Sequence, residues 1–243
     1  MSLEPASLGA ALATPDGKRR YTRQVFATIA DRYDLITRIL SFGFDTHWKR
    51  ELVTLAGLGP KDCVLDLACG TGDLAYLTLP RVERVVGLDL THRMLVLARQ
   101  KAPTARRVRF LTGDMTALPF PDASFTVITT GYGLRNVPDL PLAIAEARRV
   151  LTPGGRLLSL DFNRPEDPFV RAVYLGYLQV VGGILGWLLH RDPDTYRYIP
   201  ETIRCYPGAE GVARLFREGG FDHVEARPLL GGLMTIHIAH RPA

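Results

Sequence analysis

Short apolar stretches alternate with amphipathic ones along most of this 243-residue chain. Five stretches have the length and the β-branched content of buried strands: 64–67, 84–88, 108–111, 125–130 and 156–160. Between them, apolar positions repeat every three or four residues, which predicts helices over 73–79, 92–101 and 139–151. Strands and helices that alternate through short connections predict parallel pairing and right-handed crossovers. We therefore expect an α/β fold, an open sheet with helices on both faces.

The two ends of the chain add further elements. Helices are expected over 24–40 (two short ones), 48–58 and 208–219. Two late strands, 223–227 and 234–240, flank the pair Gly231-Gly232. Strands joined by a glycine turn form an antiparallel hairpin, so we expect such a hairpin to extend the parallel sheet. A turn is expected at Pro153-Gly154-Gly155, just before the fifth strand.

An apolar run over 172–189 is interrupted only by Gln179 and is long enough to span a bilayer. It lies between the fifth predicted strand and the two late strands, so a span would divide one sheet between the two sides of the membrane. We therefore expect two short apolar helices around Gly182-Gly183 that form a lid. Such a lid would shelter an apolar ligand and carry a face able to touch a membrane surface.

The pattern predicts one domain over residues 21–243, after a disordered tail over 1–20. Within the domain we expect an N-terminal helical cap over 21–58 and the lid insertion at about 163–207. The first residues lack the charged-then-apolar order of a secretory signal. We therefore expect a cytoplasmic protein that is at most peripheral to the inner face of the membrane.

Composition narrows the possible functions. Hydrophobic residues make up 47% of the chain and charged residues 23%, which is ordinary for a globular protein. The formal net charge is +5, but Lys and Arg are scattered, so a nucleic-acid partner is not expected. The three cysteines, Cys63, Cys69 and Cys205, are odd in number and lack paired spacing. This pattern argues against a disulfide framework and a metal site, and favours a reducing compartment.

Candidate chemistry begins with the loop that follows the first predicted strand. Gly70 and Gly72 stand one residue apart there, between Asp66 and Asp73. Glycine adopts backbone angles that other residues avoid, so a flat ligand could approach the main chain closely. Asp89 follows the second strand and is suited to grip the two hydroxyl groups of a ribose. The sequence therefore predicts a nucleoside-containing ligand at the carboxyl ends of the strands.

Two such ligands compete. The order Gly70-x-Gly72-x-x-Ala75 fits a variant of the dinucleotide fingerprint, so an NAD-dependent oxidoreductase is one hypothesis. However, Asp73 stands where the pyrophosphate would lie, and Asp66 is a second acid nearby. A ligand with a ribose, a cationic sulfonium and an ammonium group suits an acidic site better, and S-adenosyl-L-methionine is such a ligand. Asp114 would then meet the exocyclic amine of adenine, and the backbone of Met115 its ring.

More specific motifs lie outside the glycine loop. They are Tyr33-Asp34 with Leu40-Ser41-Phe42-Gly43 and Trp48, Gly133-Leu134-Arg135-Asn136-Val137, the stretch 194–203 with Pro207, and Gly231-Gly232 with His237. With them the chain resembles the ubiquinone/menaquinone biosynthesis C-methyltransferase family from about Tyr21 to Arg241. The resemblance implies the class I methyltransferase fold, with a mostly parallel seven-stranded sheet. It also implies that Ala68, Thr71 and Leu90 help to bind the cofactor.

The chain departs from the family pattern at several positions. The family has Met-Asn where Ile36-Thr37 stand, His at Asp45, Gly at Cys69, and Lys, Glu and Ser at Thr152, Asp161 and Asn163.

The implied reaction methylates a ring carbon of a prenylated hydroquinone and releases S-adenosyl-L-homocysteine. The carbon becomes nucleophilic when the neighbouring hydroxyl ionises, and an arginine beside that oxygen would favour the ionised form. The resemblance assigns this role to Arg135, with Tyr33 bonded to the same oxygen or to a water, and Asp89 nearby. His237 is a candidate acceptor for the departing ring proton. Tyr196, Tyr198 and Arg204 are candidates for lining the acceptor pocket.

The sequence leaves the acceptor open between a naphthoquinol such as demethylmenaquinol, the benzoquinol equivalent, and another phenolic compound. It also leaves the length of the prenyl tail and a homodimer open. The expected partners are therefore a lipid quinol and a membrane surface.

Overall fold

The computed structural model describes residues 14–243, and it contains one seven-stranded sheet with the order β3-β2-β1-β4-β5-β7-β6. The strands are β1 (Cys63–Leu67), β2 (Arg84–Asp89), β3 (Val108–Thr112), β4 (Phe125–Gly131), β5 (Leu151–Phe162), β6 (Asp222–Leu229) and β7 (Met234–His240). The first five pair in parallel, whereas β7 is antiparallel to both β5 and β6. The predicted parallel sheet with a late antiparallel hairpin is confirmed.

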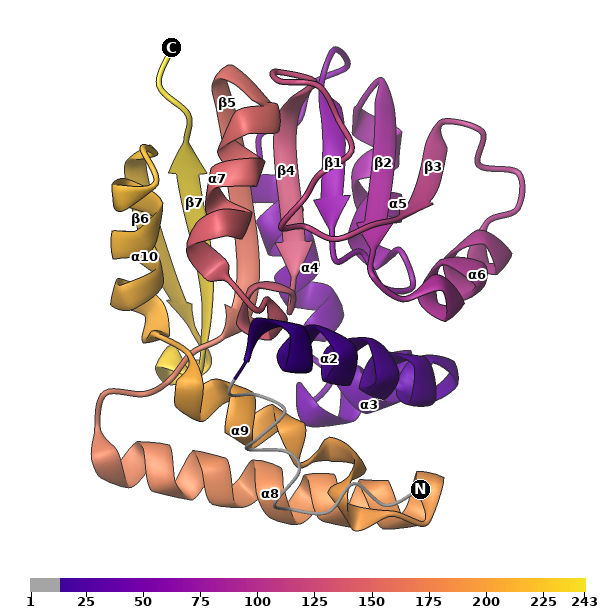
Figure 1. Ribbon diagram of the computed structural model, residues 1–243, viewed down its shortest axis with the longest axis vertical. Coiled ribbons are helices and arrows are strands. Elements are labelled where there is room, and N and C mark those ends of the chain that lie inside the picture. The colour runs from indigo at the N-terminus through magenta and orange to yellow at the C-terminus, as the bar shows by residue number, and fades with distance from the viewer. Residues whose placement is uncertain (1–13) are drawn as a thin grey trace.

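Helices cover both faces of this sheet (Figure 1). One face carries α4 (Asp45–Leu55), α5 (Asp73–Thr78) and α6 (His92–Lys101), and the other carries α7 (Leu140–Val150) and α10 (Gly208–Glu218). Short 3-10 helices are η1 (Ala30–Arg32), η2 (Leu79–Arg81), η3 (Leu134–Asn136), η4 (Pro193–Tyr196) and η5 (Leu230–Gly232). Along β1 the side chains alternate, because Val64 joins the core under α4 and α5 while Leu65 and Leu67 join the core under α7 and α10.

A third layer of helices closes the carboxyl ends of the parallel strands. It consists of α2 (Pro15–Ile29), α3 (Tyr33–Leu40), α8 (Pro168–His190) and α9 (Tyr198–Cys205), which lie below the sheet in Figure 1. Their own core includes Ile29, Leu40, Leu178 and Ile203, each at most 6% exposed. The N-terminal cap and the later insertion therefore pack on each other, although the sequence separates them by more than a hundred residues.

The structure corrects the predicted start of the domain. Helix α2 begins at Pro15, and the Thr14 hydroxyl caps it by accepting a hydrogen bond from the amide of Gly17, at 3.2 Å. The tail expected over residues 1–20 therefore does not reach residue 20, and its first 13 residues lie outside the described part of the chain. The signal was present in the sequence, since a threonine followed by proline is a typical helix start.

The prediction of two short lid helices is wrong, because α8 is one continuous helix of 23 residues. Gly182 and Gly186 do not break it. A Cβ atom on Gly182 would lie 3.2 Å from Cβ of Tyr196, and one on Gly186 only 2.5 Å from the carbonyl oxygen of Asp192. These glycines therefore let the chain after the helix pack closely against it, which is a tertiary reason for their presence.

The turn predicted at 153–155 is part of β5 instead. Leu151 pairs with Phe125 of β4 and Arg156 pairs with Val127, so the residues between Leu151 and Arg156 form an irregularity within one long strand. Gly154 has φ of +72° at this point. The sequence correctly marked a deviation there, but the strand continues through it.

Candidate active site

Three adjoining cavities lie between the carboxyl ends of the parallel strands and the helical cap. We name each after one lining residue: the Asp89 cavity, the Asp73 cavity and the Arg135 cavity. Tyr33 of α3 and Tyr132, which follows β4, line all three. The two tyrosines therefore mark the place where ligands in different cavities would meet.

The glycine loop forms one wall of the first two cavities. Gly70 has φ of +53° and lines both cavities, and its neighbours Ala68 and Thr71 line one or both. Gly72 has φ of +84° but turns the other way, because a Cβ atom there would lie 3.0 Å from Cζ of Phe110. The close approach of ligand to backbone that the sequence predicted for two glycines is thus available at Gly70, whereas Gly72 allows β3 to pack behind the loop.

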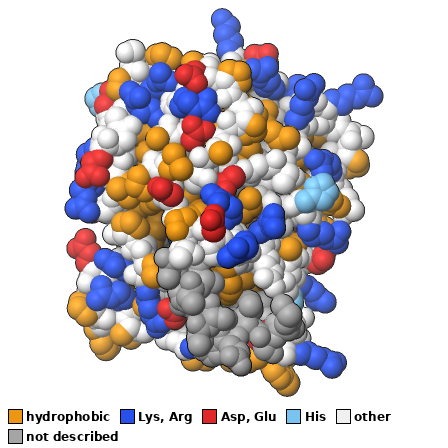
Figure 2. All heavy atoms as spheres, viewed as in Figure 1, with side chains coloured by type: hydrophobic (Ala, Val, Ile, Leu, Met, Phe, Trp, Pro, Cys, Tyr) orange, Lys and Arg blue, Asp and Glu red, His pale blue; other side chains and the backbone are white. Residues whose placement is uncertain are grey.

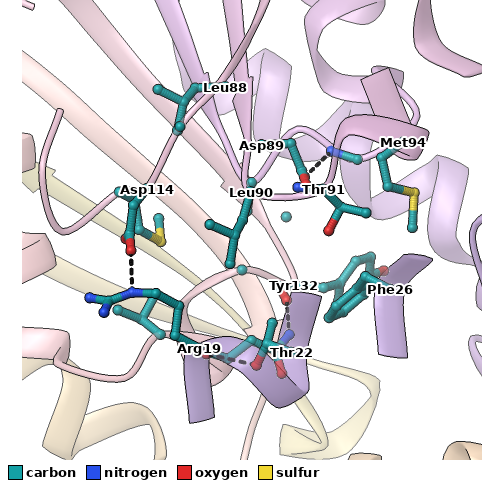
Figure 3. Close-up of a pocket in the computed structure, with 18 of the residues that line it drawn as sticks. Arg19, Thr22, Phe26, Leu88, Asp89, Leu90, Thr91, Met94, Asp114 and Tyr132 are labelled. Carbon is teal, nitrogen blue, oxygen red and sulfur yellow. Dashed lines mark hydrogen bonds and ion pairs between the residues drawn. The ribbon is translucent and has the colours of Figure 1, made fainter. Parts of the chain in front are cut away.

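Asp89 fixes the glycine loop and lines the cavity named after it (Figure 3). Its carboxylate accepts hydrogen bonds from the amides of Gly70, at 2.8 Å, and Thr91, at 2.7 Å. Burial raises the pKa of this carboxyl to about 6, against the opposing effect of the two backbone donors. Each oxygen accepts one amide and keeps a further lone pair, so the group can still accept hydrogen bonds from a ligand.

The predicted adenine end of this cavity carries Leu90, Asp114 and Met115 in its lining. Asp114 already accepts a hydrogen bond from Nε of Arg19, at 2.6 Å, as the dashed line in Figure 3 shows. Arg19 belongs to α2, and the sequence does not predict its part in the site, because residues 1–20 show the pattern of a tail. Thr22 and Phe26 of the same helix also line the cavity. Helix α2 therefore supplies a wall of the candidate nucleoside site.

The Asp73 cavity is less acidic than the sequence suggests. Asp73 pairs with Nζ of Lys49 at 2.8 Å and with Nζ of Lys101 at 2.7 Å. Burial opposes its charge, but these two cations outweigh burial and lower the pKa of Asp73 to about 2. Because these two lysines compensate the one negative charge of Asp73, the repulsion between Asp73 and a phosphate is weaker than we predicted.

Asp66 lies deeper, under the same loop. It is 1% exposed and accepts hydrogen bonds from the amide of Ala75, at 3.0 Å, and from the Thr129 hydroxyl, at 2.9 Å. Burial raises its pKa to about 7 in spite of these donors. Asp66 also lines the Asp73 cavity. This cavity therefore presents acids and a lysine side by side, which suits a ligand group that carries both charges.

The Arg135 cavity is mostly apolar. Its lining includes Tyr33, Trp48, Phe162, Tyr174 and Tyr198 around the guanidinium of Arg135. No carboxylate and no imidazole is among the described residues that line it.

Asp161 and Phe162 hold the guanidinium of Arg135 in a fixed orientation. Its Nη1 donates to Oδ1 of Asp161, at 3.1 Å, and its guanidinium lies 4.6 Å from the centre of the Phe162 ring. Arg135 is 4% exposed, and its Nε has no hydrogen-bond partner among the described residues. Arg135 thus brings a buried, unpaired donor to an apolar cavity, and an anionic oxygen is the kind of partner that such a donor favours.

Three predicted site residues lie away from these cavities. His237 of β7 is 2% exposed, and its Nε2 is 2.8 Å from the carbonyl oxygen of Ala209 in α10. Tyr196 is fully buried against α8, where its hydroxyl meets His190. Arg204 forms an exposed ion pair with Glu201. Their proposed roles stay predictions, and none of the three lines a described cavity.

Comparison with known proteins agrees with this arrangement. The model of the ubiE/COQ5 methyltransferase family matches residues 15–241. Demethylmenaquinone methyltransferase of Thermus thermophilus is 42% identical over 221 residues, which cover 90% of this chain and 100% of that protein. Ubiquinone/menaquinone biosynthesis C-methyltransferase UbiE of Francisella philomiragia is 36% identical over 230 residues, 92% of each chain. A methyltransferase structure from Thermotoga maritima that depends on S-adenosylmethionine has a TM-score of 0.64 over 90% of this chain and 99% of that one, at 20% identity, which shows a shared fold.

Proposed function

The chain belongs to the ubiE/COQ5 methyltransferase family, and on that premise we propose that it methylates a ring carbon of a prenylated hydroquinone, with demethylmenaquinol as the first acceptor to test. The family and the relatives make the protein an S-adenosylmethionine-dependent C-methyltransferase of menaquinone or ubiquinone biosynthesis. The relative at 42% identity carries the demethylmenaquinone name, which favours the naphthoquinol over the benzoquinol.

The residues of two cavities fit the cofactor. Asp89 would accept the ribose hydroxyls, because the residue lines the cavity and its carboxylate oxygens have lone pairs left. Asp114 and Met115 would contact the adenine. The mixed charges of Asp66, Asp73 and Lys49 suit the ammonium and carboxylate of the methionine part. When bound, S-adenosylmethionine supplies an electrophilic methyl group on a sulfonium.

The assignment of the acceptor rests on the environment of Arg135. Its unpaired Nε would donate to the ionised hydroxyl of the quinol, which normally titrates near pH ~10. Asp161 orients the guanidinium through its bond with Nη1. Burial alone would lower the pKa of Arg135, but the neighbouring Asp161 carboxylate helps to raise it, so the guanidinium stays charged. The apolar walls exclude water, which strengthens the attraction between the guanidinium and the phenolate.

Tyr33 would serve as a second donor at the same oxygen. Burial raises the pKa of its hydroxyl well above the usual value, in spite of Lys49 and Arg135 nearby, so Tyr33 stays protonated at neutral pH. It borders the cofactor and acceptor cavities at once. A protonated hydroxyl there can orient the acceptor ring toward the methyl group, and it does not act as a base.

The test is a methyl-transfer assay with purified protein, S-adenosylmethionine and a demethylmenaquinol that carries a short prenyl tail. We expect the product to gain the mass of one methyl group. Arg135→Lys keeps the charge but loses the fork of donors, and its turnover should fall about 100-fold with little change in cofactor affinity. Arg217→Lys, an exposed arginine paired with Glu210 on α10, is the matched control.

A near-normal rate for Arg135→Lys would show that another group activates the quinol. Calorimetric binding of NADH without binding of S-adenosylmethionine would refute the proposal as a whole.

A further inference from the structure

One side of α8 is apolar and exposed along nearly its full length. Six large side chains on it are between 54% and 77% exposed: Phe169, Val173, Val180, Ile184, Trp187 and Leu188. Their spacing of three, four or seven residues, with Leu188 beside Trp187, aligns them on one side of the helix. The opposite side is packed on the protein through Tyr174, Leu175, Leu178, Gly182 and Gly186. A continuous apolar face of this kind marks a binding surface.

The face continues onto the helical cap. Leu35 and Ile39 of α3 are 46% and 38% exposed, and Phe42, just after α3, is 54% exposed. The ring of Phe42 stacks on Tyr177 of α8 with a centroid distance of 5.2 Å, which joins the two parts into one surface. We call this combined surface the α3–α8 face. In Figure 1 α8 forms the lower edge of the molecule, and Figure 2 shows hydrophobic and basic side chains near each other at the parts of that edge that the grey residues leave visible.

The Arg135 cavity opens toward the α3–α8 face. Phe42 and Leu230 line that cavity and are also 54% and 39% exposed. Tyr174, on the buried side of α8, lines the cavity from within. An acceptor bound near Arg135 therefore has an apolar route to this surface.

Positive charges border the same surface. Arg38 lies on the exposed side of α3, between Leu35 and Ile39, and Arg191 caps the C-terminal end of α8. Arg32 lies close enough to His190, the last residue of α8, to lower the pKa of that histidine together with burial, the larger cause. These three arginines have no carboxylate partner within 4.0 Å among residues 14–243. They are therefore free to meet anionic groups.

We propose that the α3–α8 face lies on the surface of an anionic lipid bilayer, so that the mouth of the Arg135 cavity opens into the membrane. The use of that cavity for a lipid quinol rests on the proposed function, whereas the membrane contact rests on the exposed face alone. The prenyl tail then stays in the bilayer while the quinol ring enters the cavity. The arginines pair with lipid phosphates, and the apolar side chains enter the boundary of the acyl chains.

Two other arrangements fit less well. Helix α8 is the one helix in the described part of the chain that is long and apolar enough to cross a membrane. Crossing would strip away its packing on η4, where the backbone approaches Gly186 too closely for any side chain. A second copy docked through the same face would bring identical arginines together across a two-fold axis, which is unfavourable.

The two tryptophans of the chain provide the assay. Trp187 is 63% exposed on the proposed contact face, whereas Trp48 is 4% exposed in the core. With phosphatidylglycerol vesicles we expect the emission of Trp187 to shift to the blue and to be quenched by brominated acyl chains. With pure phosphatidylcholine vesicles binding should be weaker, because the arginines lose their anionic partners. Unchanged emission with both kinds of vesicle would overturn the proposal.

A matched pair of variants tests the surface itself. Ile184→Glu places a charge in the α3–α8 face and should weaken vesicle binding about tenfold or more. Leu142→Glu changes a leucine that is 46% exposed on α7, outside this face, and should bind vesicles as the unchanged protein does. Equal losses in both variants would overturn the assignment. So would size-exclusion data in which the unchanged protein forms dimers that Ile184→Glu dissociates, without vesicle binding.

Activity separates this inference from the proposed function. Ile184→Glu should methylate a soluble acceptor with a short tail at the normal rate, but a long-tailed acceptor embedded in vesicles about tenfold more slowly. If the unchanged protein methylates neither acceptor, the proposed function fails, and the fluorescence assay still decides the membrane contact. If Ile184→Glu methylates both acceptors normally, the membrane contact does not deliver the acceptor and the inference fails.

Discussion

Lys49 connects the helical cap to the cofactor loop through a buried ion-pair network. Its Nζ lies 2.8 Å from Oδ2 of Asp45 on its own helix and 2.8 Å from Oδ2 of Asp73 at the start of α5. The side chain is only 7% exposed and lies 5.7 Å from the centre of the Tyr132 ring. Burial alone would lower the pKa of Lys49, but Asp73 and Asp45 outweigh it and raise that pKa, so the lysine is charged.

Lys49→Met keeps the length of the side chain and removes its charge. Asp73 then retains Lys101, at 2.7 Å, but Asp45 loses its cation and keeps only polar donors such as the Tyr132 hydroxyl, at 2.7 Å. Breaking a buried ion pair from one side costs about 3–5 kcal/mol. For a chain of this size that loss corresponds to a fall of about 6–20 °C in Tm.

Urea unfolding followed by far-UV circular dichroism measures this cost. Adding Asp45→Asn to Lys49→Met removes the stranded charge and should restore about 1–3 kcal/mol of the free energy of unfolding. Lys61→Met, at an exposed position before β1, is the control and should change stability by less than about 0.5 kcal/mol. The reasoning is refuted if Lys49→Met unfolds like the unchanged protein, or if the two substitutions are simply additive.

Three further predictions concern the site and the packing of α8. Burial raises the pKa of Asp89 to about 6, and the carboxylate form is the one that accepts the ribose hydroxyls. The affinity for S-adenosylmethionine, measured by calorimetry, should therefore fall about tenfold per pH unit below pH 6 and level off above it. A flat profile would contradict the ribose assignment. Tyr33→Phe should lower turnover about 10–100-fold while cofactor affinity changes little, and an unchanged turnover would exclude the hydroxyl from the reaction. Gly186→Ala places a Cβ 2.5 Å from a carbonyl oxygen and should cost about 1–3 kcal/mol. Gly176→Ala, which meets nothing within 4 Å on the same helix, should gain about 0.5–1 kcal/mol in thermal unfolding, and effects of equal sign would contradict the packing described.

The folded-state pKa of Asp89 also has a consequence for stability. Because it is raised above the unfolded value, protonated Asp89 favours the folded state, and this contribution is lost as the pH rises through about 6. The contribution of Asp89 to the free energy of unfolding should therefore be smaller at pH 8 than at pH 5 in the ligand-free protein. The cofactor binds the carboxylate form, so its binding should offset this loss of stability at pH 8. Thermal unfolding at the two pH values, with and without S-adenosylmethionine, measures both effects.

The sequence predicts which candidate cofactor residues lie together, because these residues are close in sequence to strand ends. Asp89 is the last residue of β2, and Asp114 and Gly70 lie within three residues of the ends of β3 and β1, while parallel strands bring their carboxyl ends to one edge of the sheet. The sequence predicts the helix from residue 24 but not the first part of α2, because that polar, arginine-rich part shows little apolar periodicity before Tyr21. Two features fix the start of α2. The cap at Thr14 is local and can be seen in the sequence, whereas the contact between Arg19 and Asp114 is tertiary and cannot.

Local pattern by itself determined the alternation of strands and helices and the late antiparallel hairpin, and it placed the candidate nucleoside residues at one edge of the sheet. Each of these follows from periodicity, turn chemistry and the geometry of parallel strands, which act over short distances along the chain. The tertiary structure alone decided which charges are compensated, because the partners Lys49 and Lys101 reach Asp73 from other helices. It also decided that α8 is one helix with one face buried and one exposed, since packing against η4 uses its glycines as contacts rather than as breaks.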